Sequence, residues 1–515
     1  MRRLTPETRL AFGGILTVLA LASTNMTVVG TALPRIIAEL DGFELYAWAF
    51  TAFTLTSTVS LPVYGRLGDR YGRKGVLLFG IVLFTLASVA AGFSQTMAQL
   101  VATRALQGLG GGALIAMTWA VLGDLFNPRE RGRYQGYTSG VFGVSSVVGP
   151  LIGGVITDTL GWRWVFFVVV PVALVAFVLV RRYVPSGATS RDGGVDILGA
   201  LLLIASTTPL LLALSLAGVR YPWSSAPIVA LLLLAALLLL VLLRHERRAS
   251  NPVVPLELFR NRIVRLTSIG SALVGVGLFA AIFYLPLYVQ GVLGGSASAS
   301  GLVLSPLMLG FVAATAASGA HASRTGHTWG WLIAGALLTT LGFLAAMLSF
   351  DTTTPTLVVV LVSVLIGVGL GPLMSLQVVV AQAAVSSAAL GTVTSANQFA
   401  RQMGGTIGVA AFGAVMAATL QRGLAELPGV SALSGEAQAL VTSPNTLTDP
   451  ARLSRAQALI TRDIGPEAIE TIIGAARSAL ADGLGWTFAV SALLALAALV
   501  VTARLPRTAL PDTQA

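Results

Sequence analysis

The sequence predicts an all-α, polytopic membrane protein, because apolar residues dominate it and charged residues are scarce. Of its 515 residues, 55% are apolar and only 10% are charged, and the mean hydropathy is +0.84. A soluble protein of this size carries roughly 25% charged residues to cover its surface. The apolar residues also gather in long runs, each close to the ~20 residues that an α-helix needs to cross a bilayer.

Fourteen apolar runs, bounded by charged residues, Pro or Gly, are predicted to be transmembrane helices. A helix satisfies its backbone hydrogen bonds within one segment, whereas a membrane β-barrel shows alternating stretches of ~10 residues. In chain order, the predicted spans cover residues 10–33, 46–64, 76–93, 100–122, 135–156, 164–180, 195–216, 228–243, 266–289, 298–317, 329–348, 357–380, 391–420 and 484–501.

The distribution of basic residues predicts the orientation. Most Lys and Arg fall in segments on the same side as the N-terminus, whereas the short segments on the other side hold only Arg35, Arg163 and Arg220. By the positive-inside rule, both termini are expected in the cytoplasm, in a chain of the plasma (inner) membrane. The net charge of +11 is thus explained by the basic residues that set the orientation of the chain in the membrane. No nucleic-acid partner is expected, because the basic runs are short and scattered.

The chain is predicted to consist of two six-helix half-bundles, residues 1–183 and 245–515, separated by a two-helix insertion at 184–244. The segment 65–72 after the second span is repeated as 319–326 after the tenth, with both flanking Gly and one Arg at a constant offset of 254 residues. Internal duplication is typical of secondary transporters, whose halves move about a site near the bilayer midplane.

Residues 421–482 form a long predicted external loop between the last two spans. The loop is too long for a simple connector, and residues 451–479 have helix-compatible spacing that is broken at Gly465 and Pro466. Three interpretations remain open: a solvated cap, a gate, or a docking surface for an external partner.

Residues 65–74 (GRLGDRYGRK) are the most specific pattern in the chain. The glycines permit tight turns, while Asp69, Arg70 and Arg73 offer charge pairs that can clamp helix ends in one state and break in another. We predict a coupling or gating role for these residues, together with Asp124 at the edge of the fourth span.

Together with four other motifs, this segment resembles the fourteen-span drug:proton antiporter family of the major facilitator superfamily. The other similar segments are 104–108 (RALQG), 149–154 (GPLIGG), 162–166 (WRWVF) and 401–405 (RQMGG). The resemblance implies proton-driven multidrug efflux by alternating access, a route to antibiotic resistance. Gly149 and Pro150 stand in the antiporter-associated motif. Because Pro breaks a backbone hydrogen bond of the helix, they are expected to act as a hinge or an ion-leak seal, the alternative being close helix packing.

Arg104 is the clearest charge inside a predicted span. An Arg at the centre of a span costs about 2.5–3.5 kcal/mol on insertion scales and is tolerated where it faces a polar interior. Asn25 stands where the resembled antiporters usually carry an Asp, at a depth comparable to that of Arg104, so a hydrogen bond between the two is expected. Because Asn does not titrate, proton coupling must use a carboxylate at the rim of a span, or it is weak or absent.

The predicted substrate cavity combines Arg side chains with polar and aromatic residues. Arg401 either faces the interior, as Asn397 one turn away suggests, or snorkels to the interface. A cavity without a buried carboxylate favours neutral, zwitterionic or anionic amphiphiles over permanent cations. The candidate wall residues are Thr24, Asn25, Thr27, Gln107, Phe279, Phe283, Tyr284, Asn397 and Arg401.

The function most consistent with the sequence is secondary export of small amphipathic compounds in exchange for protons, by a monomer that needs no cofactor. The alternatives are an exporter of lipids or lipid-like molecules, a facilitator without proton coupling, and a non-transporting receptor. An enzyme is not expected, because the three His fall in loops and no nucleophile–base or metal spacing is evident. ATP-driven transport is disfavoured, since the chain has no Gly-x-x-x-x-Gly-Lys-Ser/Thr motif.

Overall fold

The computed structural model describes residues 5–40, 46–126, 128–186, 196–217, 221–249, 252–253, 256–295, 297–386, 389–425, 430, 433–442, 444–447 and 450–507. Over these residues the chain is a bundle of helices, and its one extended pairing is an isolated bridge between Ala217 and Tyr221. The predicted all-α class is therefore confirmed.

The helices follow the apolar runs and extend beyond many of them. In chain order they are α1 (Pro6–Leu40), α2 (Tyr46–Tyr71), α3 (Arg73–Gly92), α4 (Met97–Leu125), α5 (Pro128–Thr159), α6 (Trp164–Phe167), α7 (Val169–Tyr183), α8 (Ile197–Leu216), α9 (Ala226–Glu246), η2 (Leu256–Arg260), α10 (Arg262–Leu287), η3 (Tyr288–Val292), α11 (Ala297–Thr325), α12 (Trp329–Ser349), α13 (Thr356–Ala383), α14 (Leu390–Ala425), α15 (Gly435–Val441), η6 (Pro444–Leu447), α16 (Pro450–Asp463) and α17 (Ala468–Ala503).

Eleven of the described helices are long and apolar enough to cross a membrane. The predicted spans outside this set correspond to α1, α2 and α5, which have 35, 26 and 32 residues. These three are long enough to cross a bilayer, but α2 is rich in Ser and Thr, and α5 begins with four charged residues among its first six. The count of fourteen spans therefore stays a prediction.

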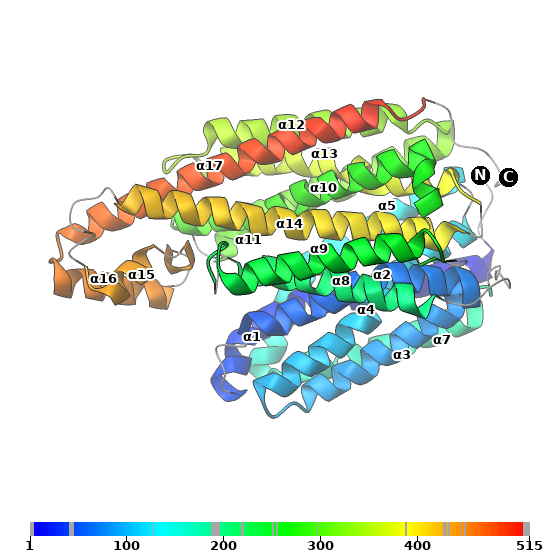
Figure 1. Ribbon diagram of the computed structural model, residues 1–515, viewed down its shortest axis with the longest axis horizontal. Helices are drawn as coiled ribbons and strands as arrows, with labels where there is room; N and C mark the ends of the chain where they lie inside the picture. Colours follow the sequence, from blue (N-terminus) through cyan, green and yellow to red (C-terminus); the bar gives the residue numbers. More distant parts are fainter. Residues whose placement is uncertain are drawn as a thin grey trace.

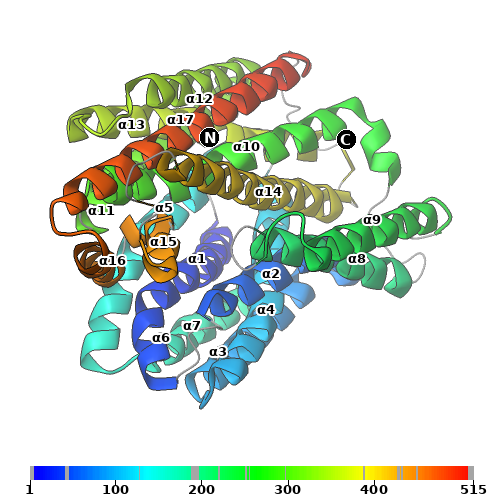
Figure 2. The same ribbon diagram turned by 60° about the vertical axis from the view of Figure 1, so that its left-hand side comes forward.

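The long helices form two groups that meet along two seams. Figure 2 shows α10–α14 and α17 gathered on one side and α1–α4 with α7 on the other, with the α8–α9 pair at their junction. Helix α2 packs along α14, and α5 packs along α11. Helix α1 begins and α17 ends at one end of the bundle, which we call the terminus side, while α15 and α16 lie at the opposite end, the cap side (Figure 1).

The segment 65–74 is mostly helix, which corrects the expectation that its glycines form tight turns, except at Gly72. Helix α2 continues to Tyr71, and Gly72 makes the turn with a φ of 91°, a left-handed conformation that favours Gly. At the repeated position after α11, Gly326 has a φ of 75°. Gly65 serves packing instead of turning, because a Cβ there would lie 2.4 Å from the Oγ of Ser395 in α14.

Other glycines also bring helix backbones together. A Cβ at Gly108 or Gly112 of α4 would lie 2.3 or 2.7 Å from backbone oxygens of α2. A Cβ at Gly367 or Gly371 of α13 would lie 2.1 or 2.5 Å from backbone oxygens of α11. Small residues at this spacing let helices approach closely in lipid.

The predicted loop 421–482 is largely helical. Helix α14 continues to Ala425 and α17 already begins at Ala468, so both project past the bilayer on the cap side, since 36 residues span about 54 Å against a hydrocarbon core of ~30 Å. Between them, α15, η6 and α16 pack their apolar residues Val441, Leu447 and Ile460 against the core to which α17 contributes. The predicted break is confirmed, since α16 ends at Asp463 and Gly465 follows with a φ of 120°.

Candidate functional site

Asp69 joins the two helix groups at the terminus side. It lies near the end of α2, is 2% exposed, and accepts hydrogen bonds from the first turn of α14. These come from Gly391 N at 2.8 Å, Thr392 N at 2.7 Å and Thr392 Oγ1 at 2.7 Å. The unpaired N–H groups at the start of a helix carry a partial positive charge, so they stabilise a carboxylate there. Asp69 therefore fastens α2 to α14 across one seam.

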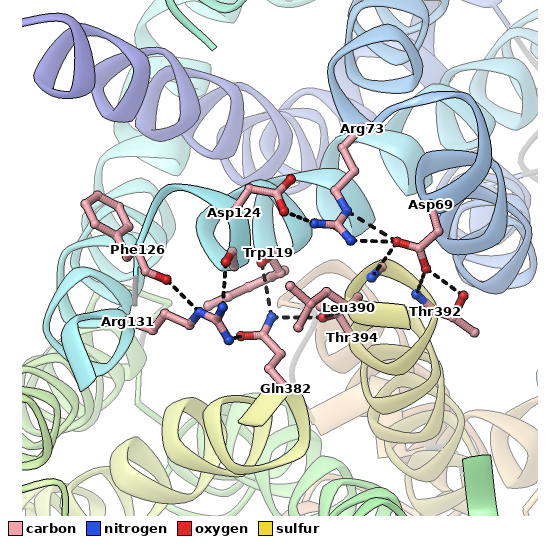
Figure 3. Close-up of polar contacts among 12 residues, drawn as sticks. Asp69, Arg73, Trp119, Asp124, Phe126, Arg131, Gln382, Leu390, Thr392 and Thr394 are labelled. Atoms are coloured by element: carbon pink, nitrogen blue, oxygen red, sulfur yellow. Dashed lines mark hydrogen bonds and ion pairs between the residues drawn. The ribbon is translucent and has the colours of Figure 1, made fainter. Parts of the chain in front are cut away.

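Arg73, the first residue of α3, extends this contact into a chain of charges (Figure 3). Its Nη2 donates to Asp69 Oδ1 at 2.7 Å and its Nη1 pairs with Asp124 at the end of α4. The predicted clamp residues Asp69, Arg73 and Asp124 thus form one cluster. The fourth, Arg70, places its guanidinium 5.5 Å from the ring centre of Tyr71.

A second link lies beside this cluster and was missed by the sequence analysis. Arg131 of α5 donates to Phe126 O at 2.9 Å and to Gly123 O at 2.6 Å, and its Nη1 lies 3.5 Å from Gln382 Oε1 of α13. Gln382 Nε2 donates in turn to Thr394 Oγ1 of α14 at 2.9 Å (Figure 3). A lone Gln near a helix end gives no signal in the sequence, because its partners are set by helix packing.

We call Asp69, Arg73, Asp124 and the first turn of α14 the latch. Its charged hydrogen bonds are shielded from water and support one another, so they are strong while the carboxylate is ionised. Neutralising Asp69 weakens every contact of this side chain at once. The arrangement can therefore hold the terminus side closed and release it as a unit.

Arg104 lies fully buried between α4, α2 and α1. Its Nε donates to Ala49 O at 3.1 Å, and its Nη1 donates to Asn25 Oδ1 at 2.8 Å and to Gln107 Oε1. The guanidinium also lies 4.4 Å from the ring centre of Phe53, a favourable cation–π distance. The hydrogen bond expected between Asn25 and Arg104 is present.

Arg401 of α14 is also buried, at 5% exposed, and does not snorkel to the surface. Its Nη1 lies 3.5 Å from Met374 O of α13. One turn earlier, Asn397 Oδ1 lies 2.7 Å from Ser271 Oγ of α10, which also lies 3.0 Å from Gln377 Oε1 of α13. Asn397 is therefore engaged in packing α10, α13 and α14 together, whereas Arg401 makes one long contact.

A cavity of about 50 Å³ lies at the seam between α2 and α14. It holds a few water molecules at most and is far smaller than the ~300 Å³ of a small ligand pocket. Its lining residues are Phe53, Thr54, Ser57, Thr58, Leu61, Ile115, Gln398 and Gln402. The predicted wall residues do not line this cavity, although Phe53 contacts Arg104 and Gln398 follows Asn397 in α14. The polar run in α2 was the sequence signal that could have indicated the cavity.

The aromatic candidates lie along α10. Tyr284 is buried, and its hydroxyl donates to Val409 O of α14 at 2.7 Å. Phe279 packs against Phe283 with 5.9 Å between ring centres, and Phe283 is 44% exposed. Tyr284 therefore ties α10 to α14, while Phe283 is the candidate with a free surface.

The remaining predicted residues lie in α1 and α5. Thr24 is half-buried and Gly149 is buried. The side chains of Thr27 and Pro150 are outside the described part of the structure. Among the described side chains, no group of three or more His, Asp or Glu could hold a metal ion.

Comparison with known proteins gives consistent matches along the chain. The profile of the Major Facilitator Superfamily matches residues 15–196 and 186–409. The chain is 33% identical over 461 residues to the Multidrug transporter protein MdtP of Bacillus subtilis, covering 89% of this chain and 84% of that protein. It is 33% identical over 412 residues to Multidrug resistance protein 3 of the same organism, covering 79% and 80%.

The fold is also similar to a solved transporter. The crystal structure of a bacterial homolog of the human lysosomal transporter Spinster, in an inward-facing and unoccupied conformation, matches with a TM-score of 0.59 and 17% identity. The match covers 97% of this chain and 98% of that one.

Proposed function

Because this chain belongs to the major facilitator superfamily, we propose that it is a secondary exporter of small amphipathic compounds that exchanges them for protons by alternating access. Members of the superfamily are membrane transport proteins rather than enzymes. Two relatives are named a multidrug transporter and a multidrug resistance protein, which supports drugs as cargo and a role in antibiotic resistance. We assign the protein to the plasma (inner) membrane as a monomer, with both termini in the cytoplasm and with 1–183 and 245–515 as its moving halves.

The contact of Asp69 with the first turn of α14 is the observation that carries this proposal. An alternating-access transporter needs an interaction between its halves that forms in one state and breaks in the other. Asp69 makes such an interaction through a single carboxylate. It lies at the end of the bundle that must open to the cytoplasm to admit cargo.

Proton coupling is proposed to act at this latch rather than in α1. Asn25 cannot titrate, and it already accepts a hydrogen bond from Arg104. Protonation of Asp69 would remove the negative charge that faces Arg73 and the start of α14, and so would favour opening of the terminus side. Gly149, Arg70 and Asp124 are assigned to the same gating movement.

Transport into proteoliposomes tests the proposal. The full-length protein is reconstituted, and movement of the fluorescent amphiphile N-phenyl-1-naphthylamine is followed under an imposed pH gradient. We expect transport that stops when nigericin dissipates the gradient. Asp69→Asn is expected to abolish the dependence on the gradient, whereas the matched control Asp351→Asn, in the exposed loop between α12 and α13, is expected to behave like the wild type.

The other outcomes separate the alternatives. Flux that persists without a gradient would contradict proton exchange and support a facilitator. Movement of labelled phospholipid without movement of the amphiphile would support a lipid exporter. If neither compound moves, transport itself is excluded for these cargo classes and the proposal fails.

Substitution of Asn25 by Asp probes the same coupling from the membrane interior. The change places a carboxylate within hydrogen-bond reach of Arg104 Nη1 and introduces a titrating group into α1. We expect a shifted pH dependence of transport. Gln99→Glu is the control, because this exposed side chain in the first turn of α4 accepts a hydrogen bond from Gln95 N through Oε1, and Glu retains that acceptor. Identical pH profiles for Asn25→Asp and wild type would rule out coupling between this position and Arg104.

A further inference from the structure

Arg401 differs from the other buried arginines in its lack of hydrogen-bond acceptors. Among the described residues, four arginines are buried: Arg73, Arg104, Arg131 and Arg401. Arg73 contacts two carboxylates, and Arg104 and Arg131 each contact three oxygen atoms. Arg401 has only the 3.5 Å contact with Met374 O, and its Nε and Nη2 are buried without a partner.

The helices around Arg401 supply no carboxylate. The side chain contacts α13, and its backbone carbonyl packs so closely on α10 that a Cβ at Gly275 would lie 2.0 Å from it. The sequences of α10, α13 and α14 contain neither Asp nor Glu. A guanidinium that is buried and unpaired inside a membrane is strongly unfavourable. An anion from outside the chain would satisfy it.

The other unpaired side-chain nitrogens in this part of the bundle are also donors. Gln398 Nε2, one turn before Arg401, is buried without an acceptor, and Gln398 lines the cavity at the α2–α14 seam. In the facing group, Arg104 Nη2, Asn25 Nδ2 and Gln107 Nε2 are likewise buried donors without an acceptor. The interior of each helix group therefore offers N–H groups and positive charge, which complement a ligand rich in acceptors.

We propose that Arg401 binds the anionic head of the cargo, so that the preferred substrates are amphipathic organic anions such as carboxylates and sulfonates. This inference rests on the proposed export function and names its substrate class. A guanidinium presents a planar fork of N–H groups that binds an oxyanion with two parallel hydrogen bonds. The apolar body of the cargo lies toward the seam, where Phe53, Leu61 and Ile115 line the cavity. Because that cavity is only about 50 Å³, binding requires α2 and α14 to separate.

A matched pair of probes tests the charge preference directly. 1-Anilinonaphthalene-8-sulfonate and N-phenyl-1-naphthylamine share one aromatic skeleton, and only the first carries a negative charge. Their binding is measured by equilibrium dialysis with the full-length protein in nanodiscs, with empty nanodiscs as the lipid blank. The wild type is expected to bind the sulfonate about tenfold more tightly than the neutral amine, as a charge-assisted pair of hydrogen bonds would give.

Three variants separate the role of Arg401 from a general effect of charge. Arg401→Gln is expected to lose about tenfold in affinity for the sulfonate while keeping its affinity for the amine. Arg401→Lys keeps the charge without the planar fork, and its affinity for the sulfonate is expected to lie between those of the wild type and Arg401→Gln. Arg422→Gln removes an exposed arginine from the same helix and is expected to match the wild type.

The inference is overturned if Arg401→Gln keeps the preference for the sulfonate, or if the wild type prefers the amine or binds neither probe. Failure of the export function looks different. In that case the wild type moves neither probe across proteoliposomes, although the sulfonate still binds through Arg401. Export of the amine without any preference for the sulfonate would retain the function and refute only the substrate class.

Discussion

Helix α14 contributes its first turn to the latch and also carries Arg401, yet the buried charges at these two places are satisfied very differently. Asp69 meets Arg73 and the N–H groups of the first turn, whereas Arg401, eleven residues from Leu390 at the helix start, meets only Met374 O. Buried charges that satisfy one another stabilise a single arrangement of the helices. A buried charge that the chain leaves unsatisfied is instead available to a ligand. We infer that α14 uses its first turn to hold the conformation and the turns around Arg401 to select the cargo.

The largest expected effect comes from breaking the latch with Asp69→Asn. The substitution neutralises the carboxylate that accepts hydrogen bonds from Arg73 and from three donors of α14, and hydrogen bonds to charged groups contribute about 1.5–3 kcal/mol each, so the terminus side should open. The chain has no Cys, so Ser395→Cys in α14 provides a single reporter at the seam, where its hydroxyl is buried. Labelling by a membrane-impermeant maleimide is expected to rise strongly in Asp69→Asn and to stay low in Asp351→Asn. Equal labelling in both variants would show that Asp69 does not hold the seam.

Crowding the latch should have a smaller effect than breaking it. A Cβ at Gly391 would lie 2.4 Å from Asp69 Oδ1 and 2.9 Å from Gly65 O. Gly391→Ala is therefore expected to destabilise the protein by about 1–3 kcal/mol, which thermal melting in detergent can measure. Gly75→Ala in α3 is the control, because nothing lies within 4 Å of a Cβ there. Its melting temperature should be unchanged or higher, since Ala favours a helix by ~1 kcal/mol over Gly. A similar loss in both variants would argue against a tight latch.

The two intramembrane arginines should differ in their effect on the stability of the ligand-free protein. Arg104→Gln removes hydrogen bonds to Ala49, Asn25 and Gln107 and is expected to lower stability by about 1–3 kcal/mol. Arg401→Gln removes a buried charge with one long contact and is expected to leave the melting temperature unchanged or raise it. If both variants melt equally early, the proposed difference between the two sites is wrong.

The smallest effect concerns the cap, where a partly buried carboxylate, Asp463, pairs with an exposed arginine, Arg462. Hydrogen bonds from the hydroxyl and the backbone N–H of Ser434, together with Arg462, lower the pKa of Asp463 to about 2. In the unfolded chain the pKa of an Asp carboxyl is about 3.9. The ionised form of Asp463 therefore stabilises the cap above pH 4, and this contribution is lost as the pH falls through 2. Asp463→Asn is expected to make the cap more sensitive to protease at neutral pH and to remove this acid dependence. A cap with the same protease sensitivity as the wild type at both pH values would contradict the assignment.

Much of the secondary structure could be predicted because it depends on residues near one another in the sequence. The apolar runs located the long helices, and Gly465 with Pro466 located the break before α17. The ends were placed less well, because α2, α14 and α17 continue past their apolar runs into polar sequence where tertiary contacts support them. Gly65 was misjudged as a turn residue for the same reason, since its role depends on Ser395 of a distant helix.

The candidate site likewise combines features set by local sequence with features set by contacts between distant helices. By itself, the sequence determined that the chain is an all-helical bundle of apolar segments with few internal charges, because hydropathy and helix rise depend only on local composition. It also set Asn25 and Arg104 at one depth. Only the tertiary structure decided that Asp69 meets the start of α14, that Arg131 meets Gln382, and that Nε and Nη2 of Arg401 lack an acceptor. These facts depend on how far-separated helices pack against one another, and the position of an acceptor on one helix places no constraint on the sequence of the next.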